Sequence, residues 1–170
     1  LIRSVIVYLG DPGAVIYGQV RIGKNGKPFK MWKFRSMYRN ADQMIDQLSE
    51  EQKRQYHTEF KIDNDPRITP VGNFLRKTSL DELPQLFNIL KGEMSFIGPR
   101  PERPQIIREY IEEMPEFAYR TRVKAGLAGY AQVYGKYNPT PYDKLKLDLF
   151  YIENYSVWLD LKLMLLTLKI

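Results

Sequence analysis

Residues 76–104, RKTSLDELPQLFNILKGEMSFIGPRPERP, constrain the fold more than any other part of the chain, because their prolines limit the backbone. Pro84 clashes with the preceding turn of a helix, so a helix predicted over residues 80–91 must hold Asp81 and Glu82 in its first turn. Four apolar side chains are expected on its buried side: Leu83, Leu86, Phe87 and Leu90. The segment therefore predicts two adjacent carboxylates at the start of a helix that packs on a core.

Two adjacent carboxylates at a helix start suit chemistry on a phosphate group. The free N–H groups and the positive dipole end of a helix N-terminus favour ionised carboxylates and attract phosphate. An ionised aspartate is the form that attacks phosphorus, so Asp81 is a candidate nucleophile. Adjacent residues of a helix point in different directions, which leaves Glu82 able to bind a metal that bridges a diphosphate.

The same acids also allow a purely structural interpretation. Ser79-x-x-Glu82 is a capping box, in which the serine and glutamate side chains bond to free backbone donors at a helix start. On this interpretation the acids stabilise a helix and carry no chemistry.

An arginine between two prolines closes the segment, in Gly98-Pro99-Arg100-Pro101. Pro101 disfavours a helical backbone at Arg100 and favours an extended one. A guanidinium presented in this way is suited to bind phosphate oxygens through two parallel hydrogen bonds. The alternative is an ordinary surface arginine in a proline-rich turn.

Composition narrows the chemistry. The chain of 170 residues has no cysteine, which excludes disulfides, thiolate catalysis and cysteine-bound zinc, and its single histidine, His57, argues against multi-histidine metal sites. A metal would then need oxygen ligands, which favours Mg²⁺ or Mn²⁺. The formal net charge of +6 predicts an anionic partner, and nucleic acid, anionic lipid and a diphosphate substrate all fit it.

Local patterns predict several further elements. Asn25-Gly26 is a hairpin turn signal, and residues 29–37 suit a strand that carries Lys33 and Arg35. Residues 40–60 are strongly polar with a thin apolar stripe, which predicts an exposed helix.

Both ends of the chain are apolar. Residues 1–10, LIRSVIVYLG, are too short to cross a bilayer and suit either a buried strand or the end of an upstream membrane segment. Residues 151–170 combine aromatic residues, many leucines and few charges, so they predict either a core helix or a helix at a membrane surface.

Several longer motifs occur together and in order. Together they resemble those of the bacterial sugar transferases, which are monotopic polyprenyl-phosphate phosphoglycosyl transferases. The motifs are KFRSM at 33–37, DPRIT at 65–69, RKTSLDELPQLFNILKGEMSFIGPRPE at 76–102, GLAGYAQVYGKY at 126–137 and LDLFYIENYSVWLDLKLMLLTLKI at 147–170.

The resemblance implies transfer of a sugar-1-phosphate from a UDP-sugar to undecaprenyl phosphate, with release of UMP. This reaction is the first membrane step of exopolysaccharide, capsule or glycoconjugate synthesis. The family's Asp-Glu dyad matches Asp81, as the nucleophile of a covalent aspartyl phospho-sugar intermediate, and Glu82, as a ligand of Mg²⁺.

The resemblance also assigns the remaining candidate residues. Arg100 would bind phosphate, and Asp148 matches a family acid that is either structural or at the site. Four more positions match substrate-site positions of the family: Lys33, Arg35, Arg76 and Gln132.

The implied fold is α/β (α+β-like), a compact membrane-associated single domain over residues 1–170 with short strands and several helices, some amphipathic at the membrane interface. The family's re-entrant membrane helix would lie largely upstream of residue 1. The implied location is the cytoplasmic face of the bacterial inner membrane, with lipid of the cytoplasmic leaflet as a partner and no nucleic acid. The transferred sugar, the glycan pathway and homo-oligomerisation stay open.

Two functions of other classes remain as alternatives. A basic module that only binds nucleic acid or anionic lipid explains the charge, but it leaves Asp81 and Glu82 unexplained beside a proline-flanked arginine. A metal-dependent phosphatase or nucleotidyl transferase would use the same residues without a lipid acceptor.

Overall fold

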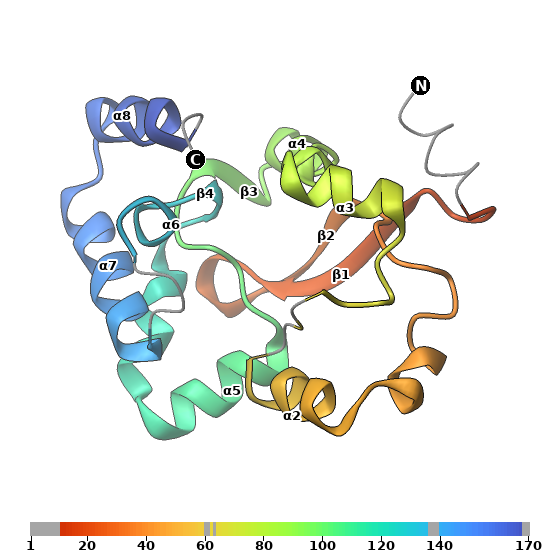
Figure 1. Cartoon of the computed structure of the whole chain (residues 1–170). Helices are drawn as coiled ribbons and strands as arrows, with labels where there is room; N and C mark the ends of the chain where they lie inside the picture. Colours follow the sequence, from red (N-terminus) through yellow and green to blue (C-terminus); the bar gives the residue numbers. More distant parts are fainter. Residues whose placement is uncertain (1–10, 60–61, 63, 136–139, 168–170) are drawn as a thin grey trace. The chain divides into compact units, whose positions relative to one another are not determined.

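A computed structural model describes residues 11–59, 62, 64–135 and 140–167 (Figure 1). The chain forms two compact units: unit 1 contains Leu1–Tyr17 and Lys33–Pro84, and unit 2 contains Gly18–Trp32 and Gln85–Ile170. Helices and short strands both occur, so the predicted mixed class is confirmed. The prediction made for residues 1–10 lies outside the described residues.

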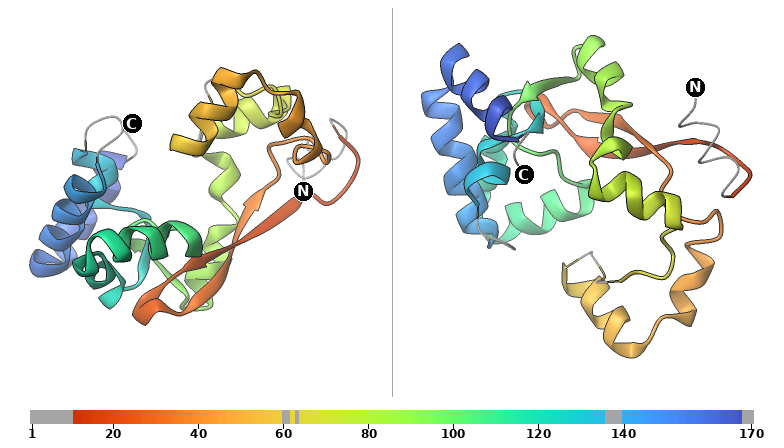
Figure 2. Two further views of the ribbon diagram at one scale, coloured as in Figure 1. Left: turned by 90° about the horizontal axis from the view of Figure 1, so that it is seen from below. Right: turned by 45° about the horizontal axis from the view of Figure 1, so that its top comes forward.

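Strands β1 (Ile16–Ile22) and β2 (Pro28–Phe34) form a two-stranded ribbon, seen from several sides in Figures 1 and 2. The turn η1 (Lys24–Gly26) joins them, with φ of 58° at Asn25 and 72° at Gly26. Positive φ at both positions is what a tight hairpin turn requires, and Asn and Gly adopt it most easily. The predicted hairpin is confirmed, although its second strand ends at Phe34 rather than at residue 37.

In unit 1, the predicted helix over residues 40–60 is two elements, η2 (Gln43–Gln47) and α2 (Glu50–Glu59). Leu48 lies between them and is buried, which requires the chain to turn inward there. Ser49 and Gln52 then start α2 with a reciprocal capping box, because each side chain bonds to the backbone N–H of the other, at 3.2 and 3.1 Å.

Helix α3 (Pro70–Lys77) packs tightly against the backbone of the KFRSM motif. Thr69 caps the helix by accepting a hydrogen bond from the N–H of Gly72 at 2.8 Å, and the N–H of Thr69 donates to the carbonyl of Ser36 at 3.1 Å. A Cβ on Gly72 would lie 1.9 Å from that carbonyl oxygen. Close approach of two backbones therefore fixes glycine at this position.

In unit 2, β3 (Met94–Ile97) and β4 (Ala125–Ala128) pair in parallel, with Met94 opposite Ala125 and Ile97 opposite Ala128. The helices of this unit precede, separate and follow the two strands along the sequence. They are α4 (Gln85–Leu90), α5 (Pro104–Glu113), η4 (Pro115–Arg122), α6 (Tyr130–Tyr134), α7 (Pro141–Asn154) and α8 (Val157–Thr167). Two cores result, one around Ile97, Tyr151 and Leu163 and the other around Phe117.

The predicted helix over residues 80–91 is wrong in extent and in its buried side. Pro84 divides it into a 3₁₀ turn, η3 (Leu80–Glu82), and the short helix α4. The four apolar side chains expected inside are exposed, up to 82% for Leu90, whereas Gln85 and Asn88 are fully buried. Polar bonds explain the orientation of α4, because the Asn88 amide accepts from the N–H of Trp32 at 3.1 Å and donates to the carbonyl of Lys30 at 2.8 Å.

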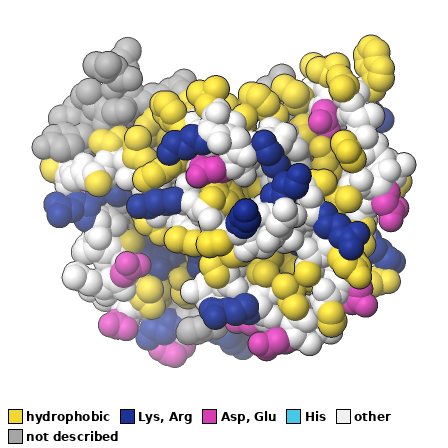
Figure 3. All heavy atoms as spheres, turned by 180° about the vertical axis from the view of Figure 1, so that it is seen from behind, with side chains coloured by type: hydrophobic (Ala, Val, Ile, Leu, Met, Phe, Trp, Pro, Cys, Tyr) yellow, Lys and Arg dark blue, Asp and Glu magenta, His cyan; other side chains and the backbone are white. Residues whose placement is uncertain are grey.

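The apolar tail forms the end of α7 and the separate helix α8. Leu163 of α8 is fully buried in the core, while Val157, Trp158 and Leu165 are each at least 65% exposed, so α8 packs on the core with one side only. Figure 3 shows hydrophobic side chains interleaved with Lys and Arg over one face of the molecule. None of the described helices has the length and apolar character needed to cross a bilayer.

We expect Gly72→Ala to lower the free energy of unfolding by about 2 to 3 kcal/mol, because a Cβ at this position meets backbone that cannot move aside. Urea unfolding of the full-length protein measures the change. Asn73→Ala on the exposed side of α3 is the matched control and should change it by less than about 0.5 kcal/mol. Equal effects of the two substitutions would show that α3 does not lie against Ser36.

Candidate active site

Asp81 and Glu82 lie in η3, directly after Ser79, whose φ of 54° is left-handed. The Ser79 side chain makes no capping bond, and the Glu82 carboxylate accepts a hydrogen bond from Lys33 at 2.7 Å. The capping-box interpretation of these acids is therefore wrong. A strained backbone at Ser79 that stabilises no cap is more typical of a functional turn than of a helix start.

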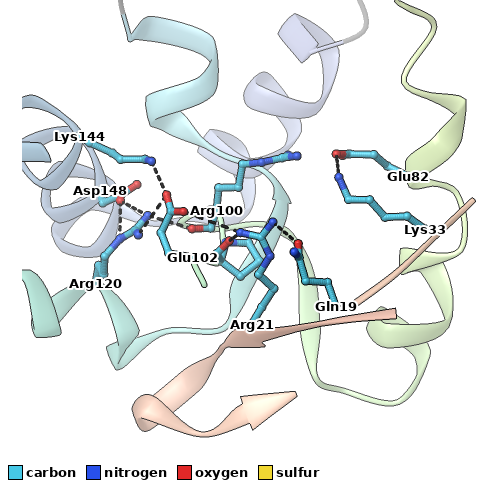
Figure 4. Close-up of polar contacts among 10 residues, drawn as sticks. Gln19, Arg21, Lys33, Glu82, Arg100, Glu102, Arg120, Lys144 and Asp148 are labelled. Carbon is cyan, nitrogen blue, oxygen red and sulfur yellow. Dashed lines mark hydrogen bonds and ion pairs between the residues drawn. The ribbon is translucent and has the colours of Figure 1, made fainter. Parts of the chain in front are cut away.

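Lys33, at the end of β2, forms an ion pair with Glu82, as Figure 4 shows. Both side chains are largely buried, at 22% and 16% exposure, so solvent screens the pair less than it would a surface pair. The ion pair connects two predicted site residues that are far apart in the sequence.

Asp81 itself is buried, with 8% of its surface exposed. Burial raises the pKa of Asp81 above its ordinary value and outweighs the opposite effects of Lys33 and Arg76, while the neighbouring Glu82 raises this pKa further. The direction is opposite to the one expected from a helix N-terminus alone, because η3 is a single 3₁₀ turn and the desolvation effect is larger. Asp81 is thus a desolvated carboxylate beside two cations.

Arg76 lies at the exposed end of α3, close enough for its charge to lower the pKa of Asp81. Its Nε donates to the hydroxyl of the buried Ser36 at 2.8 Å, which holds the plane of the guanidinium. Arg35, by contrast, is bound by Asp11, through both the carboxylate at 2.8 Å and the backbone carbonyl. Unit 1 therefore brings Lys33, Arg76, Asp81 and Glu82 together and places Arg35 in a separate ion pair.

Arg100 lies in unit 2, in the loop that follows β3. Four successive backbone carbonyls of this loop, those of residues 99–102, each accept a hydrogen bond from a different donor. The donors are the N–H of Gly126 at 3.0 Å, Arg120 at 2.9 Å, Arg21 at 3.3 Å and the N–H of Ile22 at 3.0 Å. The loop is consequently held along its whole backbone.

Glu102 is the charged centre of this region and lies between cations, as Figure 4 shows. It pairs with Lys144, Arg120 and Arg21, the two arginines each at 3.8 Å. Burial raises the pKa of Glu102, but the three cations outweigh burial and hold this pKa below its ordinary value. A short recess lined by Pro99, Glu102 and Arg120 lies beside the loop.

Asp148 in α7 is 1% exposed and binds Arg120, whose Nε and Nη2 lie 2.9 and 2.7 Å from one carboxylate oxygen. Burial raises the pKa of Asp148 even though Arg120 opposes the shift. A carboxylate enclosed in this way favours the structural alternative for Asp148. Gln132 is exposed in α6, just after β4, in the same unit as Arg100.

The sequence did not indicate Arg120 or Glu102. Glu102, directly after Pro101, is the residue from which a buried ion pair could have been predicted. A carboxylate that is buried beside such a loop needs a cation. Arg120 lies in an irregular 3₁₀ stretch without periodicity, so no local pattern distinguishes it.

The described residues contain no group of three or more His, Cys, Asp or Glu side chains placed to bind one metal ion. Asp81 and Glu82 nevertheless supply carboxylate oxygens, the donors that Mg²⁺ prefers. Because Mg²⁺ is commonly bound by one or two carboxylates together with phosphate oxygens and water, these two acids fit an ion shared with a phosphate ligand.

The buried Asp81 beside the half-buried ion pair of Lys33 and Glu82 is an arrangement suited to chemistry on phosphate esters. Comparison with known proteins agrees. The whole chain, residues 1–170, matches the bacterial sugar transferase family and belongs to it.

Three curated relatives illustrate the similarity. An uncharacterized sugar transferase of Haemophilus influenzae is 42% identical and aligns with 100% of the chain and 37% of its own length. The UDP-N-acetylgalactosamine-undecaprenyl-phosphate N-acetylgalactosaminephosphotransferase of Aeromonas hydrophila is 39% identical over 99% of the chain and 38% of its length. The UDP-glucose:undecaprenyl-phosphate glucose-1-phosphate transferase of Escherichia coli is 41% identical over 96% of the chain and 34% of its length. The chain thus spans little more than a third of these relatives.

Asp81→Asn should stabilise the protein, and more so at pH 7 than at pH 4. A carboxyl whose pKa is raised by folding contributes stability below its unfolded value, near 3.8, and loses this contribution as the pH rises through the folded-state pKa. The neutral amide does not undergo this loss. Thermal unfolding of the full-length variant and wild type across this pH range measures the effect.

Asp46→Asn, which changes an exposed carboxylate of η2, is the control and should show no comparable pH-dependent gain. A variant at Asp81 that is less stable than wild type at pH 7 would contradict the desolvation of this carboxylate.

Proposed function

We propose that the full-length protein transfers a sugar-1-phosphate from a UDP-sugar to undecaprenyl phosphate and releases UMP, with this chain as its catalytic part. The names of the relatives from Aeromonas hydrophila and Escherichia coli support the two substrates. The single observation that carries the proposal is the buried Asp81 beside Lys33, Arg76 and the paired Glu82.

In the first half of the reaction, a carboxylate oxygen of Asp81 attacks the phosphorus that bears the sugar. A bond forms between this oxygen and phosphorus, the bond from phosphorus to the bridging oxygen breaks, and UMP leaves with the electron pair. In the second half, an oxygen of undecaprenyl phosphate attacks the same phosphorus and releases the Asp81 carboxylate. Partial desolvation suits this role, because it removes water that would otherwise stabilise the attacking anion.

Glu82 would hold Mg²⁺ together with diphosphate oxygens, and the ion would neutralise charge on the leaving phosphate. Lys33 forms an ion pair with Glu82 at 2.7 Å and so supplies a positive charge next to this carboxylate. In unit 1, Arg76 would supply a guanidinium for phosphate oxygens, and a hydrogen bond to Ser36 holds its side chain. In unit 2, Arg100 is a second proposed phosphate-binding residue, and a hydrogen bond from Arg120 holds its backbone.

We further propose a monotopic location at the cytoplasmic face of the bacterial inner membrane. Large apolar side chains are exposed on α3, α4 and α8, with Phe74 at 61%, Leu90 at 82% and Trp158 at 81%. Exposed aromatic and aliphatic side chains beside basic residues favour binding to the interface of an anionic leaflet. The net charge of +6 acts in the same direction.

UMP release tests the reaction. The full-length protein in detergent, with Mg²⁺ and undecaprenyl phosphate, is incubated with a panel of UDP-sugars. We expect UMP release with at least one donor, a chelator to abolish it, and Asp81→Asn to lower the rate by about 10³-fold or more. Wild-type rates from Asp81→Asn would refute the nucleophile, and sugar phosphate released without a lipid product would indicate a phosphatase.

Glu82→Gln should raise the Mg²⁺ concentration that gives the half-maximal rate by about tenfold or more, because the variant loses one charged ligand. A Mg²⁺ titration of UMP release measures this change. Glu50→Gln on the exposed start of α2 is the control and should leave the titration unchanged. An unchanged Mg²⁺ requirement for Glu82→Gln would remove Glu82 from the metal site.

A further inference from the structure

The buried Arg120 and the half-buried Arg21 hold the loop that carries Arg100. Arg120 donates to the carbonyl of Arg100 at 2.9 Å, and Arg21 donates to the carbonyl of Pro101 at 3.3 Å. Figure 4 shows that these arginines approach Glu102, the residue that ends the loop, from different sides. Each side chain thus binds both the backbone and the carboxylate of one short segment.

We propose that Arg120 is a positioning residue for Arg100: through the Arg100 carbonyl it fixes the backbone from which the phosphate-binding guanidinium extends. The inference rests on the proposed function, since it assumes that Arg100 binds phosphate of the donor. Arg21 acts in the same way on the next carbonyl. Neither arginine needs to touch the substrate.

The geometry of Arg120 requires an arginine. Its Nε and Nη2 both bind Asp148, Nη2 also donates to the loop carbonyl, and Nη1 lies 3.8 Å from Glu102. The guanidinium carbon lies 4.8 Å from the centre of the Phe117 ring, which limits its movement. A lysine has one nitrogen at the end of a flexible chain, so it cannot keep these bonds in one plane.

The energetics favour a role in positioning over a role in stability alone. Arg120 and Asp148 are 3% and 1% exposed, and burying such a pair costs desolvation energy that apolar side chains of similar volume would not cost. The pair fixes the orientation of the Arg120 guanidinium, because Asp148 binds two of its nitrogens and leaves one N–H for the Arg100 carbonyl. Pro99 and Pro101 restrict the backbone on either side. The backbone from which the Arg100 side chain extends therefore has little conformational freedom.

A double-mutant cycle in the full-length protein tests the proposal. The variants are Arg100→Ala, Arg120→Lys and the two combined, and the readout is kcat/KM for the UDP-sugar that supports UMP release. We expect Arg120→Lys to lower kcat/KM by about tenfold or more when Arg100 is present, because a displaced guanidinium no longer meets the phosphate. In the Arg100→Ala background it should lower kcat/KM by less than about threefold, since there is no guanidinium left to position.

A matched control separates positioning from loss of stability. Arg67 in unit 1 is as buried as Arg120, at 5% exposure, and binds Asp65 through two hydrogen bonds of 2.8 and 2.7 Å. Arg67→Lys removes the same kind of ion pair without touching the loop of Arg100. Arg67→Lys should change kcat/KM by the same factor in the wild-type and the Arg100→Ala backgrounds.

An Arg120→Lys effect of equal size in both backgrounds would overturn the proposal, because it would show a general structural role. If Arg120→Lys does not fold, Arg21→Lys replaces it in the same cycle, with the same expected loss of effect in the Arg100→Ala background. Calorimetric affinity for UDP gives a second readout of the cycle that needs no turnover.

Asp81→Asn, measured in parallel, distinguishes failure of the positioning role from failure of the proposed function. An inactive Asp81→Asn together with equal Arg120→Lys effects refutes the positioning role and leaves the proposed function standing. An active Asp81→Asn refutes the proposed nucleophile, and the cycle in UDP affinity still decides the role of Arg120. Wild-type UDP affinity and kcat/KM in Arg100→Ala would overturn the positioning role directly.

Discussion

The buried ion pair between Arg120 and Asp148 is the interaction on which the loop of Arg100 depends. It joins η4 to α7, and the same guanidinium binds the loop after β3 and faces Glu102. One side chain therefore connects three elements of unit 2, in addition to the apolar packing of η4 on α7 around Phe117. Since a charge in this position is costly unless every partner is in place, the pair tolerates few arrangements of the loop.

In unit 1, an ion pair and a hydrogen bond hold charged side chains in place in a similar way. Lys33 binds Glu82, and Ser36 binds Arg76, so two cations are held beside the desolvated Asp81. The turn that carries these acids has a left-handed residue and no side-chain cap, and its local stabilisation comes from backbone hydrogen bonds. The long-range bond from Lys33 to Glu82 adds to these local bonds.

Two capping-box patterns of the same type show how far the sequence predicts the site. Ser49-x-x-Gln52 and Ser79-x-x-Glu82 both fit a capping box, and only the first forms one. The difference arises because Lys33, 49 positions away, binds the Glu82 carboxylate. The buried side of α4 shows the same limit, since the bonds of Asn88 to β2 turn its leucines outward.

Part of the local conformation followed from the sequence alone. Asn25-Gly26 determined the hairpin because these residues adopt positive φ easily. The effect of Pro84 was only partly predicted, because it divides the expected helix over residues 80–91 into η3 and α4. The motifs also placed the chain in its family. Tertiary structure alone decided the burial of Asp81, the contacts of Arg120 with Asp148 and the Arg100 carbonyl, and the exposure of Leu90 and Trp158. Burial and ion pairing depend on residues distant in the chain, and a local pattern carries no information about which of them meet.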